Sequence, residues 1–224
     1  MKKLIFIGLI LSLSVAVFAA NVALLTASKG KVDLTRSSKA AKFKVGDYLQ
    51  NKDEIRTGGE SFAAYKYVDG STTIKVFSNS VVKVTAVSNG KSLGKKATVT
   101  KGSLFCKMNP NSGTFDVQTP TTVASVKGTE FLTKLTKDRQ SMFIVFEGEV
   151  TLKILDDPET KSVTAGKTAV VEADGRFEIR QSTSEDLSEM EKAELESSRA
   201  RDNKTLRIPM VDPSGRTRYI EITH

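Results

Sequence analysis

Apolar and polar residues alternate in short runs along most of the chain, over residues 22–181. The stretch STTIKVFSNSVVKVTAV shows the period, because Ile74 and Val76, and then Val82 and Val84, recur with polar residues between them. A period of two places successive side chains on opposite faces of a β-strand. No helical period interrupts the region, so the pattern predicts a series of short strands.

Turn residues break these runs at intervals of roughly 8–12 residues, which is typical of a sandwich, barrel or roll. Asp69-Gly70 and Asp174-Gly175 lie between apolar-rich runs and predict two-residue hairpin turns, which require positive φ. The region is long enough for one well-packed core and shows no internal shift of composition. We therefore predict a single all-β domain over residues 20–182, a β-roll or sandwich that is jelly-roll-like or a short β-solenoid.

The composition changes at about residue 182, and residues 183–204 are charged and helix-forming. Acidic residues come early in this segment and basic residues late, which suits the helix macrodipole. Its apolar residues do not form one clean stripe. We predict a helix that is weakly docked or a solvated spacer, with a partner-binding helix as the alternative.

The last segment, residues 205–224, predicts a β-hairpin. Asp212-Pro213-Ser214-Gly215 places each residue type where a type I turn prefers it. A lone two-stranded hairpin is marginal in water, so we expect it to extend an edge of the main domain or to pair with another chain. Pro209 favours an edge position because it cannot donate a ladder hydrogen bond.

Residues 1–19 have the features of a secretory signal peptide. Two lysines precede an uncharged apolar run over residues 4–18, and Val17 and Ala19 fit a cleavage site after Ala19. The apolar run is shorter than the ~20 residues of a membrane-spanning helix. We expect a periplasmic or secreted protein without a transmembrane anchor.

The chain is basic, with 34 basic and 26 acidic residues. Removing the two lysines of the predicted signal peptide leaves 32 basic residues against 26 acidic ones, a net charge of +6. This excess suits anionic polymers or lipid headgroups of the envelope. The charges are dispersed and aromatic residues are few, so we expect no nucleic-acid partner.

The residues offer little for catalysis. Cys106 is the only cysteine and alternates with Leu104 and Met108, which predicts a buried core residue. The only histidine is His224, the last residue, which is a poor position for a general base that would activate a thiol or a serine. We therefore predict that the protein is not an enzyme.

The carboxylates predict neither a metal site nor a cofactor site. Asp47, Asp53 and Glu54 lack the close spacing of a calcium-binding loop. A glycosidase would need two carboxylates ~5–9.5 Å apart, and Glu130 and Glu147 are candidates that the sequence alone cannot place. The plainer interpretation is that both are exposed strand residues.

Five motifs in order, over residues 30–181, resemble the FecR-type domain, named for the periplasmic regulator of ferric citrate uptake. They are GKVDL, FKVGDYLQNKDEIRTGGESFAAYKYVDGSTTIKV, KGSLFCKM, FDVQTPTTVASVKGTEFLTKL and FEGEVTL. The matching positions are Gly46, Asp47, Ile55, Thr57, Asp69, Gly70, Ser71, Thr119, Pro120, Ala124, Val126, Gly128, Thr129, Phe131, Glu147 and Gly148.

The resemblance implies an all-β, non-enzymatic domain whose motif residues make the fold. Glycines there would supply positive φ, Asp and Thr would cap turns, and Val126 and Phe131 would be core residues. Regulators of this family resemble one another in a cytoplasmic segment that holds a sigma factor, a transmembrane helix and this domain. Since a signal peptide is predicted here instead, we expect no direct contact with a sigma factor.

Together these features predict an exported, non-enzymatic binding or scaffold module of the bacterial cell envelope, without a cofactor. The expected partner is another envelope protein. A module that binds peptidoglycan or another anionic polysaccharide is one alternative. An envelope signalling component without direct sigma-factor contact is the other.

Overall fold

The computed structural model describes residues 20–88, 93–155, 157, 159–189 and 192, and the backbone of 205–211 and 217–223. The predicted signal peptide and the predicted hairpin turn over 212–215 lie outside these residues. The described chain is nearly all β, as the alternation predicted, with one short helix over 184–189. No helix among the described residues combines the length and hydropathy needed to cross a membrane.

Seventeen strands build the main domain, and two more form a separate hairpin. Their bounds are β1 (Asn21–Lys29), β2 (Val32–Arg36), β3 (Lys39–Ala41), β4 (Tyr48–Gln50), β5 (Glu54–Thr57), β6 (Phe62–Tyr67), β7 (Thr72–Val76), β8 (Val81–Ser88), β9 (Leu93–Met108), β10 (Phe115–Gln118), β11 (Thr122–Val126), β12 (Glu130–Leu135), β13 (Ser141–Glu147), β14 (Glu149–Ile154), β15 (Thr160–Thr164), β16 (Lys167–Val171), β17 (Phe177–Gln181), β18 (Thr205–Val211) and β19 (Thr217–Thr223).

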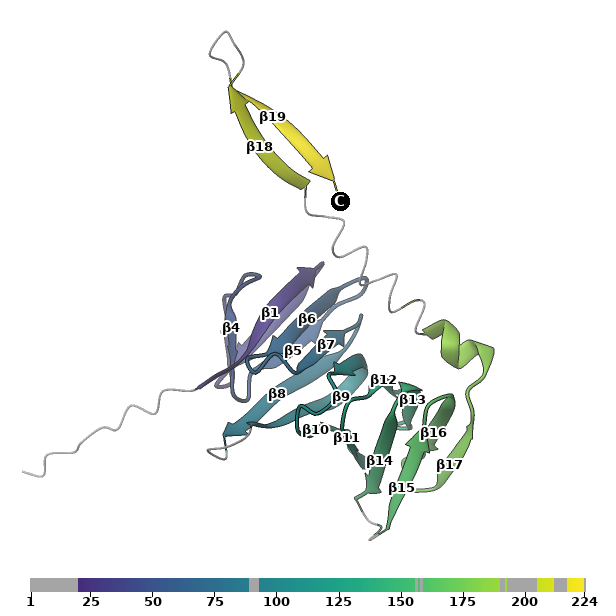
Figure 1. Ribbon diagram of the computed structural model, residues 1–224. Coiled ribbons are helices and arrows are strands. Elements are labelled where there is room, and N and C mark those ends of the chain that lie inside the picture. The colour runs from purple at the N-terminus through teal and green to yellow at the C-terminus, as the bar shows by residue number, and fades with distance from the viewer. Residues whose placement is uncertain are drawn as a thin grey trace, which may run out of the picture.

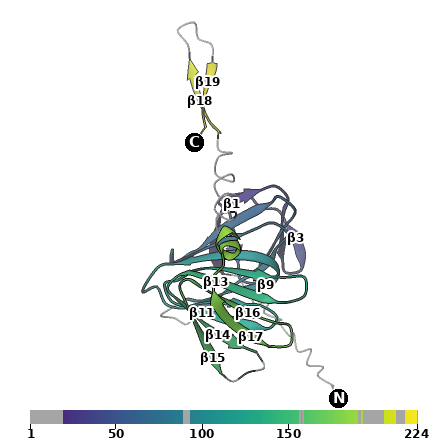
Figure 2. The ribbon, with the colours of Figure 1, turned by 90° about the vertical axis from the view of Figure 1, so that its right-hand side faces the viewer.

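The seventeen strands form two layers that share β9 (Figures 1 and 2). Layer A has the order β4-β1-β6-β7-β9-β12-β13-β16-β17. Layer B has the order β3-β2-β5-β8-β9-β10-β11-β14-β15. From β10 onward successive hairpins alternate between the layers. The chain therefore winds back and forth around one core.

The long strand β9 crosses from layer B to layer A at Gly102. Its first part pairs with β8 and β10, and its last part, from Gly102 to Met108, pairs with β7 and β12. Gly102 has a φ of +77°, and a Cβ added there would lie 2.2 Å from Ser80 Oγ. Only glycine therefore fits the crossing without a shift. Only β9 with β10 is a parallel pairing among the described strands, so the sandwich prediction is confirmed and the solenoid alternative is not.

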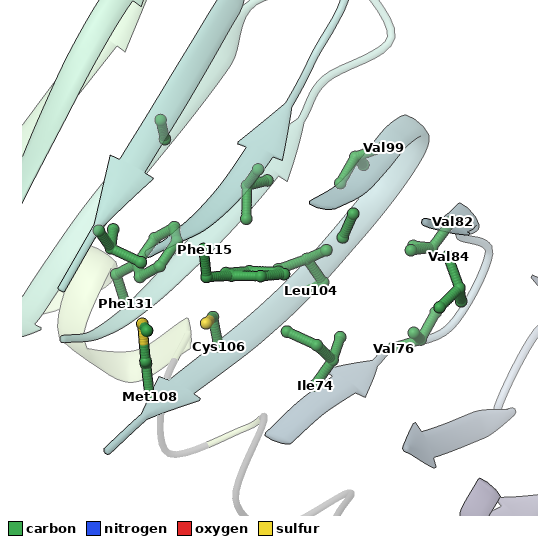
Figure 3. Packing of buried hydrophobic residues seen from close by; sticks show 14 of the residues in the cluster. Ile74, Val76, Val82, Val84, Val99, Leu104, Cys106, Met108, Phe115 and Phe131 are labelled. Carbon is green, nitrogen blue, oxygen red and sulfur yellow. The ribbon is translucent and has the colours of Figure 1, made fainter. Parts of the chain in front are cut away.

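The core lies between the layers and draws on both. In Figure 3, Ile74 and Leu104 of layer A face Val99 and Phe115 of layer B. Cys106 is fully buried among them, as predicted. Burial raises the pKa of its thiol well above the usual range, which keeps the thiol protonated and unreactive.

Layer A is also buried on its outer face, which the alternation did not predict. Phe105 lies between the core residues Leu104 and Cys106 on β9, so its ring points to the opposite side. A second apolar cluster forms on that side: Phe62, Ala64, Phe77, Phe105, Leu132 and Ile144. Strands that are apolar on both faces indicate a covered sheet.

The two Asp-Gly pairs lie in hairpin loops, but the prediction of two-residue turns is wrong. The β6–β7 loop spans residues 68–71 and the β16–β17 loop spans 172–176. In each loop the aspartate accepts a hydrogen bond from a backbone amide two residues later, at 3.1 Å. This side-chain closure stabilises a longer turn, in which glycine still supplies the positive φ.

A capping box begins the helix over 184–189. The amide of Asp186 donates to Thr183 Oγ1 (3.2 Å), and the amide of Thr183 donates to Asp186 Oδ2 (2.9 Å). Residues 190, 191 and 193–204 of the predicted charged helix lie outside the described residues. Strands β18 and β19 form the predicted hairpin, and in the described part of the chain they pair only with each other, so the expected extension of a domain edge is not seen.

Candidate binding groove

A groove of about 750 Å³ opens where β9 leaves layer B for layer A. We call it the basic groove. Three segments surround it: the β9 crossing, the β10–β11 turn and the β12–β13 turn. Its lining residues are Asn79, Thr100, Lys101, Gly102, Pro120, Lys134, Leu135, Thr136, Lys137 and Arg139.

The β10–β11 turn holds Pro120 at the groove through buried hydroxyl groups. Thr119 Oγ1 accepts a hydrogen bond from the amide of Thr122 (3.1 Å) and another from Ser141 Oγ (2.9 Å). Ser141 begins β13, next to the β12–β13 turn. The hydrogen bond between Ser141 and Thr119 therefore joins two walls of the basic groove.

Local hydrogen bonds also hold the β12–β13 turn. The amide of Thr136 donates to the carbonyl of Gln140 (2.9 Å), and the amide of Gln140 donates back to Thr136 Oγ1 (3.2 Å). Gln140 Nε2 donates to Glu172 Oε1 (2.8 Å), which ties the turn to the β16–β17 loop. Arg139 has a φ of +62°, a backbone conformation in which the surrounding hydrogen bonds hold it. The turn thus presents its cations from a defined backbone.

The third wall is fixed at the β9 crossing. Ser103 donates its amide to Ser80 Oγ (2.9 Å), and Ser80 Oγ donates to the carbonyl of Ser103 (3.1 Å). These bonds hold the segment before β8 against β9, beside Lys101. All three walls are therefore preorganised.

The basic groove combines positive charge with an apolar surface. Lys101, Lys137 and Arg139 are exposed and make no ion pair within the part of the chain that the structure describes. Lys134 pairs with Glu189 of the helix at 3.1 Å. Pro120 and Leu135 supply apolar surface between these cations. The arrangement is suited to bind an anionic group together with an apolar one.

A second hollow of about 900 Å³ lies beside a buried lysine, and its lining includes Asp69, Ser71 and the loop over 110–114. The side chain of Lys95 is 1% exposed, and its Nζ donates to Asp69 Oδ2 (2.8 Å), to Ser71 Oγ and to the carbonyl of Ser112 (3.3 Å). Burial alone would raise the pKa of Asp69, but hydrogen bonds from Lys95 and Ser71 outweigh it and hold that pKa below its usual value. All three Lys95 donors are satisfied, so this network stabilises the fold.

The first four residues of the FecR-type pattern lie in turns and core. Gly46 has a φ of +96°, and Asp47 Oδ2 accepts a hydrogen bond (2.9 Å) from a backbone amide three residues earlier. Ile55 is buried in β5. Thr57 is buried at the end of β5 and bonds through its hydroxyl to the backbone between β7 and β8.

In the second half of the pattern, Ala124, Val126 and Phe131 are core residues, each 0–2% exposed. Gly128 and Gly148 both have positive φ and approach each other closely, because a Cβ on Gly148 would lie 2.9 Å from the carbonyl oxygen of Gly128. Larger residues would not fit this contact. The prediction that the pattern makes the fold stays a prediction, and Pro120 is the member that reaches the basic groove.

The two candidate carboxylates lie side by side on neighbouring strands, where Glu130 is half-buried and Glu147 is exposed. Glu130 and Glu147 are register partners in β12 and β13. Glu130 is ion-paired with Lys107 of β9, and Glu147 is exposed. The neighbouring Thr129 is buried and donates to the backbone carbonyl of Glu149 (3.1 Å). The described residues contain no cluster of three or more metal-ligating side chains.

Comparisons with known proteins agree with this fold. The family model described as FecR protein matches residues 53–151, so the chain contains a FecR-type domain, as the motifs predicted. Gly46 and Asp47 precede the matched segment. No match was found among curated proteins.

Two similar solved structures are both crystal structures of proposed anti-sigma factors from Parabacteroides distasonis ATCC 8503. The first is 17% identical with a TM-score of 0.50 and covers 60% of this chain and 62% of its own. The second is 14% identical with a TM-score of 0.52 and covers 76% of this chain and 84% of its own. The chain thus spans less than two thirds of the first of these proteins, and the likeness is one of fold.

Sequence reasoning missed the basic groove. Its cations come from two segments that are distant in sequence, Lys101 on β9 and Lys137 and Arg139 in the β12–β13 turn. The run TKDRQ over residues 136–140 is a charged turn signal, but nothing in it indicates which strand crossing lies opposite.

Proposed function

We propose that this chain is an exported, non-enzymatic protein-binding module of the bacterial cell envelope that works in signalling. The FecR-type domain supports the signalling class, and the fold shared with proposed anti-sigma factors agrees with it. The single observation that carries the proposal is the basic groove. It has three exposed cations, one on β9 and two in the β12–β13 turn, that make no ion pair within the described residues. A preorganised surface binds with a smaller entropic cost than a mobile one.

Binding would use the basic groove as a rigid receptor. Exposed cations increase the rate of encounter with an acidic partner, and the apolar surface between them slows dissociation. The outer strands of the two layers offer backbone groups for strand addition as a secondary contact, with β4 and β17 in layer A and β3 and β15 in layer B.

Site-specific crosslinking in the envelope tests the proposal. A photoreactive amino acid replaces Lys137 in one variant and Lys153, an exposed residue of β14, in the matched control. We expect Lys137 to yield one or a few defined adducts, identified by mass spectrometry, that Lys153 does not yield. Identical adducts from both positions, or none from either, would contradict a protein-binding role for the groove.

The same cations keep one second candidate open, a module that binds an anionic polysaccharide such as peptidoglycan. Co-sedimentation with purified sacculi across a salt series separates the two. Polysaccharide binding would be strong at low salt and lost at high salt, because exposed charges are screened. Absence of binding at every salt concentration would exclude this candidate.

A further inference from the structure

We infer that the basic groove binds a short acidic peptide segment with an apolar side chain between its carboxylates. We also infer that Glu189, which is ion-paired with Lys134 of the groove, competes with this segment. This inference rests on the proposed function and specifies the chemistry of the partner. It follows from the charges of the groove, its apolar surface and the ion pair made by the helix.

The basic groove carries positive charge from two segments of the chain. Lys101 reaches the groove from β9, and Lys137 and Arg139 reach it from the β12–β13 turn. The cations thus stand on two walls of the groove, and Asp138 is exposed in the same turn as Lys137 and Arg139. A segment with carboxylates on both sides of a central residue would meet both walls at once. An arginine also binds a carboxylate through two parallel hydrogen bonds.

Pro120 and Leu135 give the basic groove an apolar surface. Pro120 is exposed, and Leu135 is 8% exposed at the base of the groove. A buried leucine or isoleucine of the partner would lose water against these two residues. A sugar polymer gains little from such a surface. A peptide is therefore favoured over a polysaccharide.

The helix over 184–189 already brings an acidic side chain to the groove. Asp186 anchors it to the domain: Oδ2 accepts from Thr168 Oγ1 (3.1 Å), and the carboxylate is ion-paired with Arg180. One turn later, Glu189 reaches Lys134 at 3.1 Å. The molecule itself thus shows a glutamate on a helix bound to a lysine that lines the groove.

The volume of the basic groove suits a short peptide segment. A volume of about 750 Å³ is within the range of pockets that bind drug-sized ligands. The groove therefore suits a few residues of a partner rather than a whole domain face. The rest of the partner would stay outside it.

Direct binding measurements test the inference on the chain from residue 20 onward. The probe is a fluorescent pentapeptide of four glutamates around a central leucine, and the controls carry a central serine or four lysines. We expect the leucine peptide to bind, the serine peptide to bind about tenfold more weakly and the lysine peptide not to bind. High salt should weaken binding because the cations are exposed.

Matched substitutions locate the site. Lys137→Gln with Arg139→Gln should weaken binding of the leucine peptide about tenfold. Lys39→Gln with Lys153→Gln removes the same charge from exposed positions outside the groove lining and should leave binding within about twofold. Equal weakening by both pairs would show a nonspecific charge effect and would overturn the inference.

The ion pair with the helix gives a further test with the opposite sign. Glu189→Gln releases Lys134, so the leucine peptide should bind about threefold more tightly. Glu185→Gln, exposed on the same helix, should change little. If Glu189→Gln does not increase the affinity for the leucine peptide, Glu189 does not compete with the peptide for Lys134.

The remaining outcomes are also decisive. If a polysaccharide fragment binds and the peptides do not, the partner class is wrong. If no peptide binds while crosslinking at Lys137 still captures a specific protein, the acidic peptide is wrong and the proposed function stands. If crosslinking fails as well, both fall together.

Discussion

Lys95 and the cations of the basic groove show two opposite uses of positive charge beside a hollow. Lys95 is 1% exposed, and all its donors are bonded to Asp69, Ser71 and Ser112. Lys137 and Arg139 are exposed and make no ion pair within the described residues. The hollow beside Lys95 is larger, but Lys127 is the one exposed cation among its lining residues. The smaller groove has three exposed cations for a partner.

Availability to solvent, rather than proximity to a cavity, therefore distinguishes a binding cation from a structural one. A buried ammonium group must be paired within the fold, because an unpaired charge in the interior is costly. An exposed cation remains hydrated and adds little to stability. Lys134 is intermediate, since its 38%-exposed side chain is paired with the helix residue Glu189.

Lys95→Met should have the largest effect on stability. It removes the buried ammonium group and leaves Asp69 without its cation, so we expect the free energy of unfolding to fall by about 3 kcal/mol, measured by urea denaturation. Adding Asp69→Asn should recover part of the loss, because the unpaired carboxylate is then gone. A loss below about 0.5 kcal/mol would mean that Lys95, like the groove cations, contributes little to the free energy of unfolding.

Gly102→Ala should come next, since it disturbs the crossing that forms one wall of the basic groove. The added Cβ would lie 2.2 Å from Ser80 Oγ and 2.6 Å from Ser80 Cα, so we expect a loss of about 2 kcal/mol. Gly166→Ala is the matched control, because Gly166 also has positive φ but has open space around it. Equal losses for the two variants, measured by thermal unfolding, would show that close packing at Gly102 is unimportant.

Acidification should loosen the helix anchor. The Arg180 hydrogen bond lowers the pKa of Asp186 to about 2, although burial acts in the opposite direction. Its contribution is therefore complete above the unfolded-state value of 3.8 and is lost as pH falls toward 2. The difference corresponds to about 2 kcal/mol. The gap in unfolding free energy between the wild type and Asp186→Asn should narrow over this range. If this difference in unfolding free energy stayed constant with pH, the ionised carboxylate of Asp186 would not be what anchors the helix.

Lys137→Gln with Arg139→Gln should have the smallest effect on stability. Because neither side chain has an ion-pair partner in the described chain, the free energy of unfolding should change by less than about 0.5 kcal/mol. Urea denaturation of this variant and of Lys95→Met compares the contributions of the groove cations and of the buried lysine to stability. A loss of 2 kcal/mol or more would show that the groove cations are structural.

Much of the fold could be predicted from local pattern. Alternation at Ile74, Val76, Val82 and Val84 predicted strands that the structure contains, and Cys106 was correctly placed in the core. The loop lengths were predicted wrongly, because the backbone amide of Ser71 donates a hydrogen bond to Asp69 and closes a longer turn that the Asp-Gly pair alone does not reveal. The outer apolar face of layer A was missed for a different reason: alternation predicts one buried face for each strand, whereas Phe105 and Leu132 are buried on the other face of layer A.

By itself, the sequence determined the fold class, the family resemblance and the candidate core, since all three depend on local periodicity and ordered motifs. Only the tertiary structure decided which cations are available. Lys95 and Lys101 lie on the same strand, yet one is buried against Asp69 and the other lines the basic groove. Their environments differ because Lys95 lies where β9 pairs with both β8 and β10, whereas Lys101 lies at the end of the β8 pairing, next to the crossing at Gly102. No local pattern specifies which turns will face each part of that strand.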